Sequence, residues 1–491
     1  MKKEYEGLNK MADEAIFKQI QEIVGPEHVS NEGPVLIAYE RDQHWPFVTP
    51  NRPDIVVQPK TTEEIQKIMR IANEKKIPIV PLSRGVNVRG LCVPAKKGSI
   101  VIDLRLMNRI LEVNPEMMTA TVEPGVTHGQ LQIAVREKGC RICIPGAPAT
   151  GSILANYLLR GVYHTNAGDG IDHALSAEFV LPSGELLKVG SAAFPNSTPH
   201  WRYTCSPDLM GLFQSMPGSM GICTKMTVKL YPLWEHETWF MLGYDTIEDA
   251  IKSIPKLMNA RIPSVLWVLP QYTVIKLIAK KTKQLEKLRG SFPEFTVPMT
   301  IEGPKEIVDA KVKVAIDIIK STSPPKTPLK PVPPPTNFVK EFKYPRNILG
   351  FLRAGSYHAL AFYGPLNKYP EYIKMMKDNG EKAGYKREQV DLLASPYAQF
   401  WGQAMYYEAE VPYTSAREES VEMVKKFHYA TLRDLIKIGI YGWFRPFLNP
   451  MKLVMDDLGT YGKLWQDIMK LIDPNEIMNP GKVFPMEKEL T

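Results

Sequence analysis

Two kinds of hydrophobic pattern alternate along the first half of the chain. Residues 12–24 and 61–75 carry apolar side chains at the three- and four-residue spacing of an amphipathic helix. Thr61, followed by Glu64, predicts a capping box at the start of the second helix. The β-branched runs at 77–82 and 99–104 predict two buried strands. The pattern therefore predicts a helix, a strand, a loop and a second strand in succession.

A loop rich in glycine and arginine joins those two predicted strands. Its residues 83–90, SRGVNVRG, include Gly85 and Gly90, which permit backbone conformations closed to other residues. Arg84 and Arg89 stand beside backbone N–H groups, a combination suited to holding a phosphate. An ordinary hairpin loop with surface arginines fits the same residues. This stretch by itself leaves both interpretations open.

A second loop-rich region covers residues 140–173. Turn residues come first, and then Thr150, Gly151 and Ser152 open a short predicted helix. A helix start reached through Gly and Ser is another place where backbone amides could meet a phosphate or a flavin edge. A predicted hairpin with a Ser-Gly turn follows at 176–190. A short helix, a glycine turn and a strand are predicted over 208–232.

Composition narrows the classes of function. The 491 residues are 44% hydrophobic and 23% charged, which fits a soluble globular chain of two or three domains. The net charge of +8 is interleaved with acidic residues, so neither a nucleic-acid nor a membrane surface is indicated. The sequence shows no secretory leader and no apolar stretch of membrane-spanning length.

Cysteine usage points to a reducing compartment. The five cysteines, an odd number, favour free thiols and a cytoplasmic location. Cys140 and Cys143 form a CxxC pair, but no second pair or nearby His completes a metal site. Buried small thiols are the favoured interpretation, and no metal site is predicted.

Several segments, in order, resemble one family of flavoenzymes. They are PLSRGVNVRG, GSIVIDLRLMNRILEVN, ATVEPGVTHGQL, GSILANYLLRGVYHTNAGDGIDH, LPSGELLKVG, GLFQSMPGSMGICTKMTVKLYP and, near the C-terminus, IDPNEIMNPGKVFP. With these motifs the chain resembles the vanillyl-alcohol oxidase and 4-cresol dehydrogenase (p-cresol methylhydroxylase) family of FAD-linked oxidases. It resembles the D-lactate and glycolate dehydrogenases more loosely. The resemblance covers about residues 50–235 and 440–485, whereas residues 240–435 match weakly.

The resemblance implies an α+β fold with a PCMH-type FAD-binding domain. This domain would consist of two α+β subdomains, with an α+β cap domain over the flavin. The implied division is a helical lead-in at 1–47, the FAD-binding domain at 48–238, the cap at 239–438 and a C-terminal segment at 439–491 that completes the FAD domain. The Pro-rich stretch at 321–336 is expected to be an exposed loop of the cap, with a docking segment as the sharper alternative.

The resemblance also implies which residues bind FAD. The pyrophosphate would lie on the loop at 83–90, and neighbouring contacts would come from the second loop region, the strand after 220 and the C-terminal motif. The implied set is Pro81, Ser83, Arg84, Gly85, Val86, Asn87, Pro145, Gly146, Gly151, Ser152, Asn156, Gly161, Gly221, Ile222, Asn479 and Lys482. Two amide-rich loops could hold a diphosphate, and the sequence has neither a Walker lysine motif nor a Rossmann GxGxxG. A nicotinamide or nucleoside-triphosphate enzyme is therefore less favoured.

Four residues are candidates for catalysis. Asp169 matches the family's acidic residue near flavin N5, where a carboxylate can hold a proton as hydride leaves the substrate. Arg445 matches the arginine that binds the substrate's phenolate in relatives. His358 and Glu410 are candidates because the cap provides one wall of the substrate site. A turn Asp, a surface Arg and structural His or Glu residues are the alternatives.

The sequence departs from the family where the substrate and the flavin would be held. Phe444 stands where relatives have a tyrosine, and residues 88–91 lack a second tyrosine, so both phenol-binding hydroxyls are missing. A para-substituted phenol is therefore disfavoured as substrate. Ala404 stands where a tethering histidine would fall, although Tyr406 and Tyr407 lie nearby. We expect FAD to be bound noncovalently.

The predicted reaction transfers a hydride from a small alcohol or hydroxy compound to flavin N5, and electrons then pass to a partner protein or subunit. A 2-hydroxy acid dehydrogenase is the runner-up, and it would need a metal-binding His pair, whereas residues 240–435 contain no HxH. A flavin-bearing electron-transfer subunit of a larger complex is a third interpretation. A homo-oligomer or hetero-complex is expected, without nucleic acid and without a membrane span.

Overall fold

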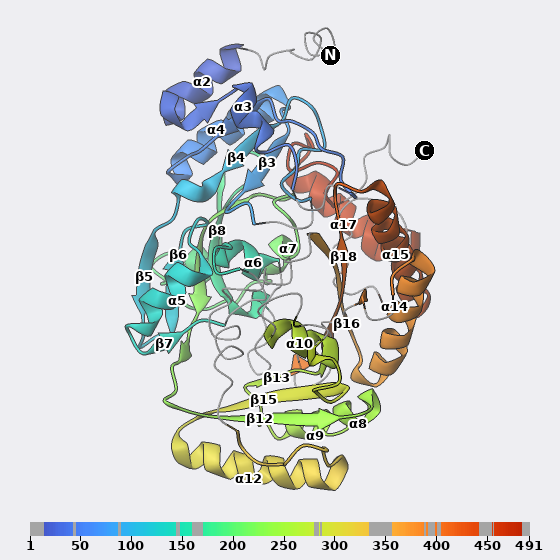
Figure 1. Cartoon of the computed structure of the whole chain (residues 1–491). Helices are drawn as coiled ribbons and strands as arrows, with labels where there is room; N and C mark the ends of the chain where they lie inside the picture. Colours follow the sequence, from blue (N-terminus) through green and yellow to red (C-terminus); the bar gives the residue numbers. More distant parts are fainter. Residues whose placement is uncertain are drawn as a thin grey trace.

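The computed structural model describes most of the chain and shows an α+β architecture. The described residues are 14–42, 46–86, 90–143, 148–159, 170–278, 284, 287–332, 356–386, 389–390, 398–399, 404–440, 454 and 456–483. Within these ranges the strands form five sheets. Figure 1 shows the N-terminal sheet at the top, a second sheet below it and a cap at the bottom and right. The predicted fold class is confirmed.

The N-terminal layer is a four-stranded sheet in the order β1-β2-β4-β3. Its elements are β1 (Val29–Ser30), β2 (Ile55–Val57), β3 (Ile79–Leu82) and β4 (Ile100–Asp103), with helices α2 (Glu14–Val24), α3 (Gly33–Ile37) and α4 (Thr62–Lys75). Helix α4 begins where the Thr61 side chain accepts a hydrogen bond from the Glu64 N–H at 3.1 Å. The Glu64 carboxylate accepts from the Lys60 N–H instead of completing the predicted box. The predicted apolar face is buried against the sheet, namely Ile65, Ile68, Met69 and Ala72.

The direction of β3 and β4 decides between the two interpretations of the loop at 83–90. The strands are parallel, with Ile79 beside Ile100 and Leu82 beside Asp103. A hairpin joins antiparallel strands, so the hairpin interpretation is wrong. The loop instead leaves the sheet at the carboxyl end of β3, which is where ligands usually bind at a parallel sheet.

The second layer is a five-stranded antiparallel sheet in the order β5-β6-β10-β8-β9. Its strands are β5 (Ile110–Asn114), β6 (Thr119–Val122), β8 (Ala174–Val180), β9 (Leu186–Gly190) and β10 (Ile222–Lys229). Helices α5 (His128–Arg136), α6 (Ile153–Leu158) and α7 (Met210–Phe213) share its core. A separate pair joins β7 (Cys140–Arg141) to β11 (Tyr231–Pro232). The predicted hairpin is confirmed as β8 and β9, with Ala177 opposite Val189.

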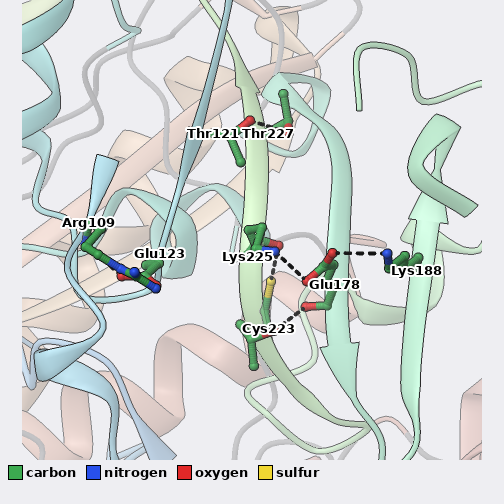
Figure 2. Close-up of polar contacts among 9 residues, drawn as sticks. Arg109, Thr121, Glu123, Glu178, Lys188, Cys223, Lys225 and Thr227 are labelled. Carbon is green, nitrogen blue, oxygen red and sulfur yellow. Dashed lines mark hydrogen bonds and ion pairs between the residues drawn. The ribbon is translucent and has the colours of Figure 1, made fainter. Parts of the chain in front are cut away.

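Cross-strand charges mark the register of this second sheet. The Glu178 carboxylate on β8 lies 3.0 Å from Lys225 Nζ on β10 and 3.6 Å from Lys188 Nζ on β9 (Figure 2). Both lysines are also the register partners of Glu178. On the other edge of β10 the hydroxyls of Thr121 and Thr227 lie 2.9 Å apart. Such pairs stabilise one register over its neighbours, because a shift of one residue would separate them.

The cap contains two sheets that share one core. The first has β12 (His236–Tyr244), β13 (Val265–Leu266), β14 (Leu269–Pro270) and β15 (Phe295–Gly303), with α8 (Ile247–Ile251), α9 (Ile254–Asn259), α10 (Gln271–Ile278) and α12 (Lys305–Thr322). The second has β16 (Ser356–Gly364), β17 (Ala398–Gln399) and β18 (Ala404–Tyr413), with α14 (Tyr369–Ala383) and α15 (Glu418–Lys437). Helices α8 and α9 follow each other closely but stay separate, because Pro255 lies in the first turn of α9 and starts a new helix. Helix α17 (Gly459–Ile472) then returns to the core of the second layer.

The described part of the Pro-rich stretch is a loop with several exposed residues, as expected, and it is also tied to the cap sheet. The Lys326 N–H donates to the Gly243 carbonyl and the Val332 N–H to the Trp239 carbonyl, each at 2.9 Å. The Thr327 hydroxyl donates to the Met241 carbonyl at 3.0 Å. Residues 326–332 therefore cover the edge of β12, and residues 333–336 lie outside the described ranges. The division into four segments given above stays a prediction.

Candidate functional site

The C-terminal end of the described chain closes the edge of β3. The Ile79 N–H donates to the Ile477 carbonyl, and the Asn479 N–H donates to the Ile79 carbonyl, both at 2.7 Å. Ile79 and Met478 form a parallel bridge. Asp473 holds this return in place, because its carboxylate accepts from the N–H groups of Ile477 and Met478. The segment from Asp473 onward thus lies beside β3 and reaches Leu91, although the sequence places it far downstream.

The Asn479 side chain joins two loops that the sequence places far apart. Its Nδ2 donates to the Leu91 carbonyl at 3.0 Å and to the Pro217 carbonyl at 2.6 Å. Asn479 is 2% exposed and has a φ of 43°, which asparagine tolerates better than most residues. The exit of the β3 loop and the loop before β10 are therefore fixed to each other through one amide.

The loop before β10 packs directly on β3. A Cβ on Gly218, whose φ is 66°, would lie 2.2 Å from Pro81 Cγ, so only glycine allows this approach. The Ser215 N–H donates to the Leu158 carbonyl at 2.8 Å, which ties the same loop to the end of α6. Pro81, the 215–222 loop and α6 consequently form one contiguous surface.

The start of α6 is built by local hydrogen bonds. Ser152 caps the helix by accepting from the Ala155 N–H at 3.1 Å, and its hydroxyl donates to the Pro124 carbonyl at 2.6 Å. The Gly151 carbonyl accepts from the His128 N–H at 3.1 Å. The predicted contribution of Gly151 and Ser152 to FAD binding would therefore come from backbone or packing, because the Ser152 hydroxyl is engaged within the protein.

Three buried polar atoms on this surface have no hydrogen-bond partner. They are Asn156 Oδ1 on α6, Ser219 Oγ beside Gly218, and Asn479 Oδ1 on the C-terminal segment. A buried polar atom without a partner is unfavourable by about 1–3 kcal/mol. They lie on three segments that contact one another, and a polar cofactor bound there could satisfy them, so the residues fit FAD. Ser219 was not among the predicted residues, and the only signal for it was its position in the GSMG motif.

Other predicted FAD residues belong to the segments that follow β3, open β10 and close the C-terminal end. Ser83, Arg84, Gly85 and Val86 follow β3 directly, and Gly85 has the left-handed φ of 70° that its glycine allows. Ile222 opens β10 and is 1% exposed, while Lys482 is fully buried next to the C-terminal closure. Gly221 has a φ of 156°, and a Cβ there would lie 3.0 Å from the Val180 carbonyl oxygen. Asn87, Pro145, Gly146, Gly161, Asp169 and Arg445 lie outside the described residues.

The inner face of the second cap sheet carries an aromatic and acidic cluster. Glu410 stands opposite Ala359, and Glu408 opposite Ala361, in the β16–β18 pairing. Tyr406 lies on the same face, donates its hydroxyl to the Glu408 carboxylate at 2.9 Å, and has Tyr363 beside it with ring centroids 5.8 Å apart. Glu410 is 7% exposed. This face holds the buried Glu410 carboxylate and, further along the strand, the Glu408–Tyr406 pair.

His358 lies on the opposite face of that sheet. Alternation along β16 separates it from Ala359 and hence from Glu410. Its Nε2 lies 2.9 Å from Nδ1 of His428 on α15, and the Phe47 ring stacks against both imidazoles at 4.6 Å. The structure thus does not bring His358 and Glu410 into one site. His358 belongs to the layer between the sheet and the outer helices, which Figure 1 shows at the right.

The described part of the chain has no cluster of metal-binding side chains and no membrane-spanning helix. No group of three or more His, Cys, Asp or Glu side chains there could hold a metal ion. No described helix is long and apolar enough to cross a bilayer. None of the five cysteines forms a disulfide, and burial raises the pKa of the Cys143 thiol to about 12, which keeps it protonated.

Comparison with known proteins agrees with the geometry. Residues 53–190 match the family of the FAD binding domain. The chain is 33% identical to 1'-carboxy-chondrochloren decarboxylase of Chondromyces crocatus (53% of this chain, 49% of the relative) and 30% identical to glycolate oxidase subunit GlcD of Bacillus subtilis (54% and 55%). It is 30% identical to the 4-cresol dehydrogenase [hydroxylating] flavoprotein subunit of Pseudomonas putida, over 62% of each chain. The matches thus span about half to three fifths of these relatives' lengths.

A solved structure extends the likeness to the whole chain. The crystal structure of p-cresol methylhydroxylase with substrate bound superposes with a TM-score of 0.83, covering 97% of this chain and 98% of that one. The sequence identity in that superposition is 23%, so it establishes the fold. The chain therefore contains an FAD-binding domain of this family, shares its overall fold with p-cresol methylhydroxylase, and uses FAD as its cofactor.

Proposed function

We propose that this protein is an FAD-dependent dehydrogenase of a small alcohol, phenol-like or hydroxy compound that passes electrons to a partner protein or subunit. FAD, when bound, supplies the acceptor for a hydride. The observation that carries the proposal is the set of unpaired buried oxygens of Asn156, Ser219 and Asn479, on three segments of the flavin domain that contact one another. The likeness to a 4-cresol dehydrogenase flavoprotein subunit supports the partner.

Glu410 is our candidate for the group that holds the substrate's proton. Its carboxylate is buried on the inner face of the cap sheet, where removal of water strengthens its interaction with a hydroxyl hydrogen. Asp169 and Arg445 remain proposed as the acid near the flavin and the anion-binding arginine. Position 444 is Phe and residues 88–91 contain no Tyr, so the two hydroxyls that would bind a phenol are missing. This favours a hydroxy compound over a para-substituted phenol as substrate.

Anaerobic bleaching of the bound flavin tests the proposal. Phenols, hydroxy acids and alcohols would be mixed with the holoprotein, and absorbance of oxidised FAD would be followed. Glu410→Gln should keep FAD and slow bleaching by about a hundredfold or more, as loss of an acid–base group does. Glu371→Gln, on the outer helix α14, serves as the matched control. A flavin that no compound bleaches would contradict the dehydrogenase proposal.

Two other functions give different results in the same assay. Bleaching by 2-hydroxy acids alone would support the runner-up, to which the likeness to a glycolate oxidase subunit lends weight. A flavin that is inert to all small molecules but is reduced by a redox protein would identify an electron-transfer subunit. The cytoplasmic location and the oligomeric state stay predictions.

A further inference from the structure

A buried ion pair joins the flavin domain to the cap. Arg141 Nη2 on β7 lies 3.0 Å from Glu302 Oε2 on β15, and the two side chains are 10% and 11% exposed. The Glu302 carboxylate holds the pKa of Arg141 above its usual range even though burial opposes the charge. Cys143 and Tyr231 also interact with the guanidinium, and Glu302 is the carboxylate paired with it.

A chain of aromatic contacts runs from Arg141 into the flavin domain. The guanidinium lies over the Tyr231 ring, 5.4 Å from its centroid, and Tyr231 Oη lies 3.1 Å from His173 Nε2. The His173 ring centroid is 5.0 Å from that of Tyr157 on α6. The Tyr157 hydroxyl donates to the Cys143 carbonyl at 2.8 Å. His173 and Tyr157 are fully buried, so no solvent separates these two side chains from their close-packed neighbours.

The path ends beside the candidate cofactor surface. Tyr157 is adjacent to Asn156, whose Oδ1 is one of the unpaired buried atoms. At the other end, Glu302 stands on the long strand β15, opposite Glu237 of β12, at the base of the cap. A change in the position of the cap would therefore shift Arg141, then Tyr231 and His173, and finally helix α6.

We propose that Arg141 and Glu302, with Tyr231, His173 and Tyr157 behind them, act as positioning residues that couple the cap to the flavin-binding surface. The proposal rests on the FAD-dependent function given above. It assigns these side chains no contact with substrate. Their role is to keep the cap and α6 in a fixed relation, so that the groups on both sides of the substrate site stay aligned.

Two variants of the holoprotein test the coupling. Glu302→Gln keeps the shape of the side chain and removes its charge, while Tyr231→Phe keeps the ring under Arg141 and removes the hydroxyl facing His173. Visible circular dichroism of the bound FAD reports its surroundings, and amide hydrogen exchange reports the cap strands. Neither readout needs turnover, so the test stands even if the substrate proposal fails.

Coupling predicts a distinct result for each variant. Glu302→Gln should raise exchange in β15 about tenfold and change the FAD dichroism, because the cap end of the path is released. Tyr231→Phe should change the dichroism while leaving β15 exchange near the wild-type value. Asp309→Asn, which breaks the exposed Lys305–Asp309 pair, should change neither. Unaltered dichroism in Tyr231→Phe would overturn the proposal, including when Glu302→Gln fails to fold.

Discussion

Asn479 alone connects three segments of the flavin domain. Its side-chain N–H groups hold two carbonyls from distant loops, and its backbone holds the edge of β3. Asn479→Asp keeps the shape and the tolerance for positive φ but cannot donate to both carbonyls. We expect FAD affinity to fall about ten- to a hundredfold, since each lost buried hydrogen bond is worth roughly 1–3 kcal/mol. Fluorescence titration of the apoprotein with FAD measures this.

The same change four residues earlier provides the control. Asn475 Nδ2 donates to Asn73 on α4, away from both loops. Asn475→Asp should lower stability without the tenfold loss in FAD affinity. If both variants bind FAD with equal affinity, Asn479 does not contribute to the FAD site.

Gly218 offers a steric test of the same surface. The Cβ of an Ala at this position would overlap Pro81 Cγ. The backbone would also be strained, because a φ of 66° is unfavourable for residues other than glycine. Gly98 has a similar φ of 78° and nothing within 4 Å of its Cβ, so Gly98→Ala isolates the backbone strain. We expect Gly98→Ala to destabilise by about 1 kcal/mol and Gly218→Ala by about 1–3 kcal/mol more, with weaker FAD binding. Urea unfolding compares them, and equal losses would argue against the close packing on Pro81.

At the scale of elements, helix α5 carries a buried histidine at its first turn. Burial lowers the pKa of His128 to about 4 from its usual 6.5, and its ring packs beside Gly151. Because the unfolded chain takes up this proton near pH 6.5 and the folded chain does not until about pH 4, stability should fall as pH drops through that window. The loss approaches about 3 kcal/mol at the acid end.

Replacing His128 removes that pH dependence. His128→Asn should flatten the decline in unfolding free energy between pH 6.5 and 4.5, whereas His200→Asn, at an exposed position, should not. Denaturant unfolding at several pH values gives both curves. Identical slopes for His128→Asn and the wild type would show that another group dominates.

Elements with strong local signals could be predicted from the sequence. Thr127 caps α5 with a full capping box, and α4, β3, β4 and the β8–β9 hairpin lie where periodicity predicts them. The role of the amide-rich loop after β3 in holding the FAD pyrophosphate stays a prediction. Local pattern could not identify Ser219 as a site residue or predict that Gly218 packs against Pro81. Both features depend on contacts between segments that are distant in the sequence. Local pattern also could not separate His358 from Glu410, whose opposite orientation follows from register.

At the scale of the whole molecule, the cap strand bears on how FAD is held. Tyr407 is buried, donates its hydroxyl to the Pro365 carbonyl at 2.8 Å, and has a pKa raised by burial. The Tyr406 hydroxyl is engaged by Glu408 at 2.9 Å. Both tyrosine hydroxyls are therefore engaged within the cap. Acid precipitation of the holoprotein should therefore release all FAD into the supernatant, and a yellow pellet would contradict noncovalent binding.

The closure of β3 by residues 477–479 has a consequence for biosynthesis. Leu91 and Asn479 are 388 positions apart, so at translation rates of about 5–20 residues per second the loop waits roughly 20–80 seconds for its partner. During that time β3, the outermost strand of its sheet, presents an open edge to other nascent chains. Cofactor capture would follow translation, and a chain that stops before residue 477 would emerge without flavin and in need of a chaperone.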